Sequence, residues 1–420
     1  MTRLRERSQA NIHRVSLLVT VLVMGAFSIA GCGDDDGAAS NQQPGTTTPT
    51  VTAMAAPTTT PSVPPGRQPG AIILPPLAQG GLLYPNAISA DGSTVVGYGK
   101  NAAGKLEAFR WTSKDGTVAL GFLPGYTDGS NAASVSGDGS KIVGISINET
   151  SQSGSAWSWT KKGGMQPIPM PVEVLGSNAI QITADGKYVL GAYTDTGQEM
   201  SAFIWSGQGE AQTVIGSESQ APDQFDPVAI SEDGFRVFFN RQMADPIPTA
   251  RQGGVVHQYG GPLGGGDWGG YNLTPQDSVD TFFIENGAIS SDGGTVAGYI
   301  HRKDNYVTPG IWLAQGIILE IAPSVIGYTK CVSPDGSMAG GGNGDEAAAF
   351  IWDMQVGFQN LMLHLRALDH ELGTHYLDAF ATTGGPADVT GIAANNKRLV
   401  GTAGQVAMSD YWAAFLLDLP

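Results

Sequence analysis

One phrase of about a dozen residues recurs seven times along the chain, and it limits the possible folds more than any other feature. Its clearest copy is Asn86-Ala-Ile-Ser-Ala-Asp-Gly-Ser-Thr-Val-Val-Gly97. Six copies carry Asp-Gly at the centre, and the seventh carries Asn395-Asn396. Such pairs between alternating apolar residues predict β-hairpins, because these residues tolerate the positive φ of a tight primed turn. The phrase therefore predicts seven hairpins.

The central residues of the seven copies set a period. They are Asp91, Asp138, Asp185, Asp233, Asp292, Asp335 and Asn395, which gives spacings of 47, 47, 48, 59, 43 and 60 residues. An aromatic strand pattern follows most copies, as in Ala108-Phe-Arg-Trp-Thr112, and then a further apolar run, as in Val118–Pro124. Four antiparallel strands per unit of this length are typical of a propeller blade. We expect an all-β fold, a seven-bladed β-propeller over residues 71–420, with an open β-solenoid as the alternative.

The two ends of the repeat region complement each other. The chain ends at Pro420, directly after the aromatic strand of the seventh copy, so that unit lacks its fourth strand. The run Ala71-Ile-Ile-Leu-Pro-Pro-Leu77 precedes the first copy and resembles the missing strand. We therefore expect residues 71–77 to complete the seventh blade.

A glycine lies six residues after the central residue in every copy except the fourth, which has Phe239 there. We interpret these glycines as belonging to a crowded inner strand, where a side chain would clash with neighbouring blades.

The N-terminus has the pattern of a targeting segment. Basic residues up to Arg14 precede the apolar run Val15–Ala30, which is short for a membrane-spanning helix and suits a signal peptide. The run ends in Ile29-Ala-Gly-Cys32, which resembles a bacterial lipobox. The resemblance implies a lipoprotein signal peptide over 1–31 and lipid attachment at Cys32; an ordinary cleaved signal with an unrelated cysteine is the alternative. We expect an exported protein, lipid-anchored to a bacterial membrane at the cell envelope or cell surface.

Residues 32–70 are rich in Thr, Pro, Ala and Ser and predict a disordered tether between the anchor and the repeats. The other cysteine, Cys331, lies in a predicted strand and is interpreted as a small buried apolar residue.

The charge of the chain limits its partners. The net charge is −16, and residues 1–31 carry +3, so their removal leaves −19. Nucleic acid is excluded as a partner, because phosphate binding needs a basic surface. Partners would be the membrane, through the anchor, and a glycan, peptide or protein ligand.

The repeats also resemble a known family. The combination of the Asp-Gly phrase with Ala108-Phe-Arg-Trp-Thr112 and Leu120-Gly-Phe-Leu-Pro-Gly125 is similar to the HAF-type repeats of bacterial exported proteins, best over residues 86–127 and with gaps to the C-terminus. The resemblance implies the repeat architecture and export, and it brings no catalytic residues.

The long spacing between the fourth and fifth copies contains a glycine-rich stretch, 255–272. We interpret it as a loop, either a flexible connection of a degenerate blade or a ligand-binding loop. Its candidate ligand-binding residues are His257, Tyr259, Asp267, Trp268 and Tyr271. It lacks the lysine and the strand–loop–helix setting of a phosphate-binding loop.

The other long spacing predicts a short amphipathic helix over 358–373, with Gly373 as its C-cap. Its His370-Glu371 and His375 differ from the zinc motif H-E-x-x-H, because ligands five residues apart do not share a helix face. We expect no metal, no cofactor and no catalytic residues. The Asp-Gly pairs are interpreted as turns and not as calcium ligands.

These observations together predict a binding or scaffold module of the cell envelope. Two alternatives stay open: an envelope enzyme, such as a lyase or hydrolase acting on glycan or peptide, and a purely structural envelope protein.

Overall fold

The structure is a computed structural model of the whole chain. It describes residues 69–79, 81–215, 223–234, 236–243, 254–258, 269–272, 281–302, 306–314, 317–343, 348–404 and 412–420. These residues belong to one compact unit, Ser62–Pro420. The predicted leader 1–31, Cys32 and the predicted tether up to residue 68 lie outside the described residues.

The unit is all-β, and its strands form seven antiparallel blades, six of them with consecutive strands. Blades 1 to 3 comprise β2 (Leu83–Ile88), β3 (Thr94–Lys100), β4 (Leu106–Thr112), β5 (Gly116–Gly121); β6 (Gly129–Val135), β7 (Lys141–Asn148), β8 (Ser153–Thr160), β9 (Gly164–Pro167); and β10 (Val174–Ile182), β11 (Val189–Asp195), β12 (Met200–Trp205), β13 (Gln212–Ile215). Blades 4 and 5 comprise β14 (Asp223–Ile230), β15 (Arg236–Met243), β16 (Gly254–Gln258), β17 (Gly269–Asn272); and β18 (Thr281–Ile289), β19 (Thr295–His301), β20 (Val307–Leu313), β21 (Ile317–Glu320). Blades 6 and 7 comprise β22 (Gly327–Val332), β23 (Met338–Asn343), β24 (Ala348–Asp353), β25 (Gly357–Asn360); and β26 (Pro386–Ile392), β27 (Arg398–Ala403), β28 (Ala413–Asp418), β1 (Gly70–Ile73).

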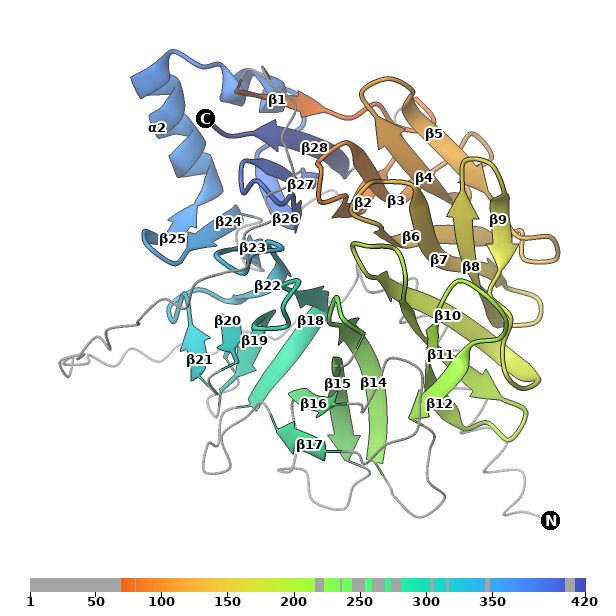
Figure 1. Cartoon of the computed structure of the whole chain (residues 1–420). Coiled ribbons are helices and arrows are strands. Elements are labelled where there is room, and N and C mark those ends of the chain that lie inside the picture. Colours follow the sequence, from red (N-terminus) through yellow and green to blue (C-terminus); the bar gives the residue numbers. More distant parts are fainter. Residues whose placement is uncertain are drawn as a thin grey trace, which may run out of the picture. The chain divides into compact units, whose positions relative to one another are not determined.

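The seven blades form a closed ring. The first strand of each blade contacts the first strands of both neighbouring blades, from β2 through β6, β10, β14, β18 and β22 to β26 and back to β2. The first strands are therefore innermost, as Figure 1 shows. The predicted β-propeller is confirmed, and the open solenoid is excluded.

The ring closes by pairing the two ends of the repeat region. β1 runs antiparallel to β28, with Gly70 opposite Asp418 and Ile73 opposite Phe415. The pairing continues for one more residue, because Leu74 N–H donates to Ala414 O at 2.8 Å. The prediction that residues 71–77 complete the seventh blade is confirmed for 71–73, which pair with β28, while 75–77 lie outside the strand.

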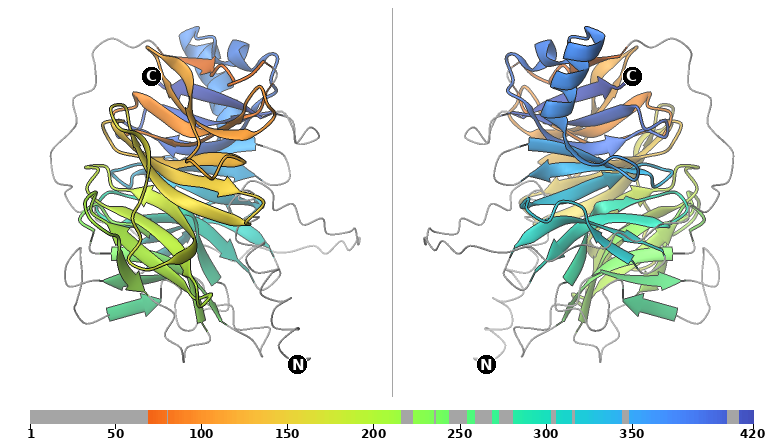
Figure 2. Two further views of the ribbon diagram at one scale, coloured as in Figure 1. Left: turned by 90° about the vertical axis from the view of Figure 1, so that its right-hand side faces the viewer. Right: turned by 90° about the vertical axis from the view of Figure 1, so that its left-hand side faces the viewer.

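The closing pair of strands is covered by the connection 361–385, which is the longest between described strands. It contains α2 (Leu361–Leu372) and the 3₁₀ helix η1 (Tyr376–Phe380). Figure 2 shows α2 at the same end of the unit as β1 and β28. Leu361, Leu365, Tyr376 and Phe380 are buried in one core cluster with residues of β28, and Ala71 and Ile73 of β1 pack against it.

The predicted helix is thus present, with a later start than expected. Its N-cap is Asn360, whose side chain accepts from Leu363 N–H, and Gly373 ends it in the left-handed conformation at φ 64°. Phe358 lies in β25 instead. Among the described residues, no helix has the length and apolar character needed to cross a membrane.

The Asp-Gly pairs of six blades, and Asn395-Asn396 of blade 7, form the hairpin between the first and second strands, but not as the primed turn that we predicted. In the first blade Gly92 N–H donates to Ser89 O at 2.8 Å, which places Ala90 and Asp91 at the turn centre. Gly92 has φ 69°, whereas Asp91 is not among the residues of positive φ. One glycine after an ordinary turn, as in a bulged three-residue hairpin loop, therefore supplies the needed twist.

The glycine six residues after each turn is also explained differently from our prediction. It lies on the second strand, and a Cβ at Gly144 would overlap Asn131 O and come within 2.7 Å of the Trp157 ring. Both obstacles belong to the glycine's own blade: Asn131 O lies next to a β-bulge of the first strand, and Trp157 is on the third. The crowding is therefore inside a blade and not between blades.

Candidate functional site

The two ends of the ring differ. We call the end that carries the seven Asp-Gly or Asn-Asn turns the turn face. The connections between first and second strands there span five residues in six blades and six residues (183–188) in the third blade. The third-to-fourth-strand connections lie at the same end and span three (113–115) to ten residues (259–268) between the strand bounds. The other end, which we call the variable face, carries the second-to-third-strand and blade-to-blade connections. These range from four residues (149–152) to 25 residues (361–385) between the strand bounds.

On the turn face, each turn is hydrogen-bonded to the turn of the next blade. At five junctions the bond joins two backbone groups: Asp91 N–H to Gly137 O (3.0 Å), Gly137 N–H to Ala184 O (2.8 Å), Glu232 N–H to Ser291 O (3.2 Å), Ser291 N–H to Pro334 O (2.8 Å) and Ala394 N–H to Ala90 O (2.9 Å). Between blades 6 and 7, Asn396 Nδ2 donates to Asp335 Oδ2 at 2.9 Å and to Ser337 Oγ at 2.8 Å. The seven turns therefore form one hydrogen-bonded ring.

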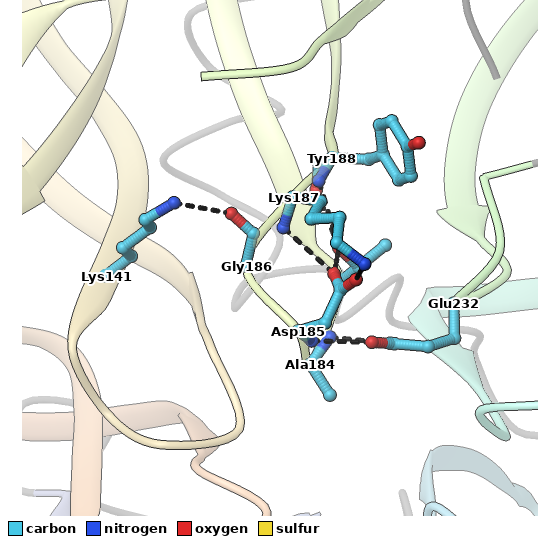
Figure 3. Close-up of polar contacts among 8 residues, drawn as sticks. Lys141, Ala184, Asp185, Gly186, Lys187, Tyr188 and Glu232 are labelled. Atoms are coloured by element: carbon cyan, nitrogen blue, oxygen red, sulfur yellow. Dashed lines mark hydrogen bonds and ion pairs between the residues drawn. The ribbon is translucent and has the colours of Figure 1, made fainter.

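The junction of blades 3 and 4 uses a carboxylate in place of a carbonyl. Glu232 Oε2 accepts from Ala184 N–H at 2.6 Å, and Glu232 Oε1 accepts from Asp185 N–H at 2.5 Å (Figure 3). On the other side of the same turn, Lys141 Nζ of blade 2 donates to Gly186 O at 2.7 Å. Burial raises the pKa of Glu232 above its ordinary value, against the lowering effect of the two N–H donors.

The turn aspartates are engaged inside their own turns. In blade 1, Asp91 Oδ1 accepts from Ser89 Oγ at 2.6 Å and from Ser93 N–H at 2.8 Å. The same pattern recurs at Asp138, where the acceptor is again Oδ1. Within the described part of the chain, no three His, Cys, Asp or Glu side chains come together as a metal site. The aspartates therefore stabilise the turns, as the sequence indicated.

The centre of the ring presents a different set of side chains. In each first strand, one residue pairs with the second-strand glycine, or with Phe239 in blade 4. In six blades this paired residue is buried and the residue just before it is half-buried. The half-buried residues are Tyr84, Asn131, Asn178, Asp226, Tyr328 and Asp388. Successive side chains of a strand point to opposite sides. The half-buried residues therefore lie on the opposite side of these innermost strands from their buried neighbours, and their partial exposure shows that solvent reaches them.

Blades 6, 7 and 1 bring charges and aromatic rings together at this centre. Lys330 Nζ of β22 lies 3.0 Å from Asp388 Oδ2 of β26, and the two side chains are 16% and 18% exposed. Tyr84 and Tyr98 of blade 1 stack with ring centroids 5.4 Å apart. Burial raises the pKa of the Tyr98 phenol, and the charge of Lys330 opposes this rise. Lys330 lies on blade 6 and Tyr98 on blade 1, with blade 7 between them. We call Tyr84, Tyr98, Lys330 and Asp388, together with Thr402, which lies opposite Asp388 in the strand register of blade 7, the central cluster.

Of the five residues predicted to bind ligand, two lie in described strands, away from the central cluster. His257 lies in β16 opposite Gly270, and Tyr271 lies in β17 opposite Val256, so residues 254–258 and 269–272 are the two outer strands of blade 4. The interpretation of 255–272 as one loop is wrong at both ends, because these residues complete a four-stranded blade. Tyr259, Asp267 and Trp268 lie outside the described residues.

Two other sequence features have structural places. Cys331 is buried, and burial raises the pKa of its thiol, as expected for a small core residue. His370 is in the last turn of α2, and His375 is beyond the Gly373 cap.

Sequence reasoning missed the central cluster. Lys330 and Asp388 come from different repeats, 58 residues apart, and only the ring brings them together. One local feature pointed to the place. The run Gly340-Gly-Gly342 in β23 stands where blade 1 has Val96-Gly-Tyr98 and blade 2 has Val143-Gly-Ile145.

The structure is similar to solved propellers. The β-propeller domain of the Trilobed protease from Pyrococcus furiosus, described as having an open velcro topology, is 13% identical, with a TM-score of 0.53 over 80% of this chain and 95% of that chain. An oligogalacturonate lyase in complex with manganese is 12% identical, with a TM-score of 0.52 over 80% of this chain and 88% of that chain. At this identity the likeness shows the fold alone. No family model and no curated protein matches the chain.

Proposed function

We propose that this protein is a lipid-anchored, extracytoplasmic binding or scaffold module of a bacterial cell envelope, and that its partner docks on the variable face. The contrast between the two faces carries this proposal. On the turn face, the seven inner turns bond to one another, five times through backbone groups alone, which makes this inner part of the face uniform. The variable face has connections of unequal length above a solvated, polar and aromatic centre.

This contrast favours a binding function, and the reason lies in the physical properties of loops. Connections of differing length and composition, held on a rigid scaffold, are where proteins place binding residues. A partner on the variable face could reach loops of several blades and the half-buried residues at the centre of the ring. The seven joined turns would keep those loops at fixed positions.

The face assignment is tested by blocking each face in turn. Ala102, in the β3–β4 connection of the variable face, and Ser140, in a turn of the turn face, are both exposed. Each is replaced by cysteine and coupled to maleimide-polyethylene glycol, which the buried Cys331 should not react with in the folded protein. Ala102→Cys coupled to the polymer should lose capture of envelope glycans, peptides or proteins, and coupled Ser140→Cys should retain it. The reverse order of effects would contradict the assignment.

The anchor is tested separately. Cys32→Ser should abolish incorporation of labelled palmitate and move the protein from the membrane fraction to the soluble fraction. Cys331→Ser, the matched control at the other cysteine, should leave both unchanged. Membrane retention and labelling of the Cys32→Ser protein would contradict a lipid anchor at this residue.

A further inference from the structure

The contact between blades 6 and 7 is closer than an ordinary blade contact. Gly342 of β23 pairs directly with Asp388 of β26, a β-bridge between two blades. A Cβ at Gly342 would overlap the Asp388 carboxylate, and a Cβ at Gly340 would come within 2.8 Å of the Val389 side chain. Gly342 stands at the strand position that Tyr98 has in blade 1. Because Gly342 has no side chain, the Asp388 carboxylate fits beside it.

The carboxylate retains hydrogen-bonding capacity in this place. Asp388 Oδ2 accepts from Lys330 Nζ, while Oδ1 has no donor among the residues that the structure describes. An ionised carboxylate can accept about four hydrogen bonds. The pair carries no net charge, so it favours a neutral ligand whose hydroxyl groups donate to the carboxylate.

A buried hydroxyl group lies next to this carboxylate. Thr402 of β27 is opposite Asp388 in the strand register, so the two side chains are neighbours on one face of blade 7. Thr402 is 0% exposed, and its Oγ1 has no hydrogen-bond partner in the described structure. A buried hydroxyl without a partner costs about 1–3 kcal/mol. Such a cost is expected where a ligand, and not the protein, supplies the partner.

Aromatic and amide side chains continue the same surface. Tyr84 stacks on Tyr98 through one ring face and is only half-buried. Asn86 Nδ2 donates to Asn131 Oδ1 at 2.6 Å, which fixes an amide pair between blades 1 and 2 on the neighbouring first strands. A ligand ring that carries hydroxyl groups on its edge and C–H groups on its face matches this combination of side chains.

We propose that the central cluster binds a neutral sugar unit of an envelope glycan. Asp388 and Lys330 bond its hydroxyl groups, the Thr402 hydroxyl supplies a further bond, and Tyr84 packs against the sugar ring. The net charge of −16 repels anionic polysaccharides and further favours a neutral one. This proposal rests on the proposed binding function and names its ligand class.

The experiment uses the full chain, purified in detergent, on an array of immobilised neutral and uronic-acid oligosaccharides. Titration calorimetry then measures the Kd for the neutral oligosaccharide that gives the strongest signal. Asp388→Asn should raise that Kd at least about tenfold, since a bond to a charged group is lost. The matched control Glu320→Gln, which alters the Arg302–Glu320 ion pair of blade 5, should change the Kd less than about twofold.

Thr402→Val separates a ligand-binding role from a structural one. Valine keeps the shape of threonine and removes the unpaired hydroxyl. It should raise the Kd about fivefold or more and raise the melting temperature of the ligand-free protein by about 1–4 °C. A lower melting temperature with unchanged affinity would show a structural hydroxyl and overturn the proposal.

Three further results would overturn the site and leave the binding function standing. The first is neutral-glycan binding that neither Asp388→Asn nor Thr402→Val weakens. The second is a preference for uronic-acid oligosaccharides. The third is no glycan signal while the polymer-blocking experiment still shows capture of another envelope component on the variable face. Loss of that capture on both faces would instead contradict the proposed function itself.

Discussion

Closure of the ring by its first strand can be tested at one residue. Leu74 follows β1, is 1% exposed, and packs in a cluster with Leu83 and Phe109 of blade 1 and Leu416 of blade 7. It therefore joins the last blade to the first. Leu74→Ala removes most of this contact without altering the β1–β28 pairing. Ile72, two residues earlier in the chain, is 46% exposed and offers a matched control.

The size of the effect follows from burial. A fully buried Leu→Ala change costs about 2–5 kcal/mol, because transfer energy is lost and a cavity remains. A half-exposed side chain outside the core costs roughly 0.5 kcal/mol. For a unit of roughly 350 residues, the entropy of unfolding is about 0.7 kcal/mol per degree. Leu74→Ala should therefore lower the melting temperature by about 3–7 °C, and Ile72→Ala by about 1 °C.

Calorimetry of the two variants beside the parent protein measures this difference. Deletion of residues 71–77 should lower the melting temperature further, since it also removes the strand that covers the edge of β28. Equal small shifts for Leu74→Ala and Ile72→Ala, or an unchanged melting temperature after the deletion, would refute closure through this segment.

Three other predictions follow from the fold. Gly144→Ala should destabilise the protein by about 1–3 kcal/mol in denaturant titration, because its Cβ overlaps Asn131 O, whereas Gly70→Ala, with open space around it, should not. Burial raises the pKa of Glu232 above its ordinary 4.5, so the stability that its protonated form contributes is present below that value and is lost as pH rises through the folded pKa. The stability of the parent relative to Glu232→Gln should therefore fall from pH 4 to pH 7, and a constant difference would contradict the burial effect. Cys331 should resist maleimide until denaturant unfolds the protein; fast labelling of the native protein would show that the thiol is accessible.

Sequence patterns predicted the blades because each blade repeats nearly the same turn residues. A glycine that tolerates positive φ and an aspartate that accepts from its own turn recur wherever the hairpin must bend. These requirements lie within a few residues, so spacing alone revealed them. The same regularity exposed the incomplete seventh unit and the strand at Ala71 that completes it.

Blade 4 shows where this reasoning failed. Its phrase lacks the second-strand glycine, and its outer strands, β16 and β17, are glycine-rich, so 255–272 looked like a loop. Pairing with β15 gives these residues their strand conformation, and this pairing is not visible in local composition. His257 and Tyr271 were therefore assigned to a loop, whereas they lie in β16 and β17.

The sequence by itself determined the hairpins, the number of blades and the closing strand, since local turn chemistry and a period carry that information. Only the tertiary structure decided how the seven turns bond to one another at one end of the ring, and which side chains meet near its centre. Lys330 and Asp388 belong to different repeats and share no motif. Their proximity comes from closing the ring, which places every first strand at one centre whatever its distance along the chain.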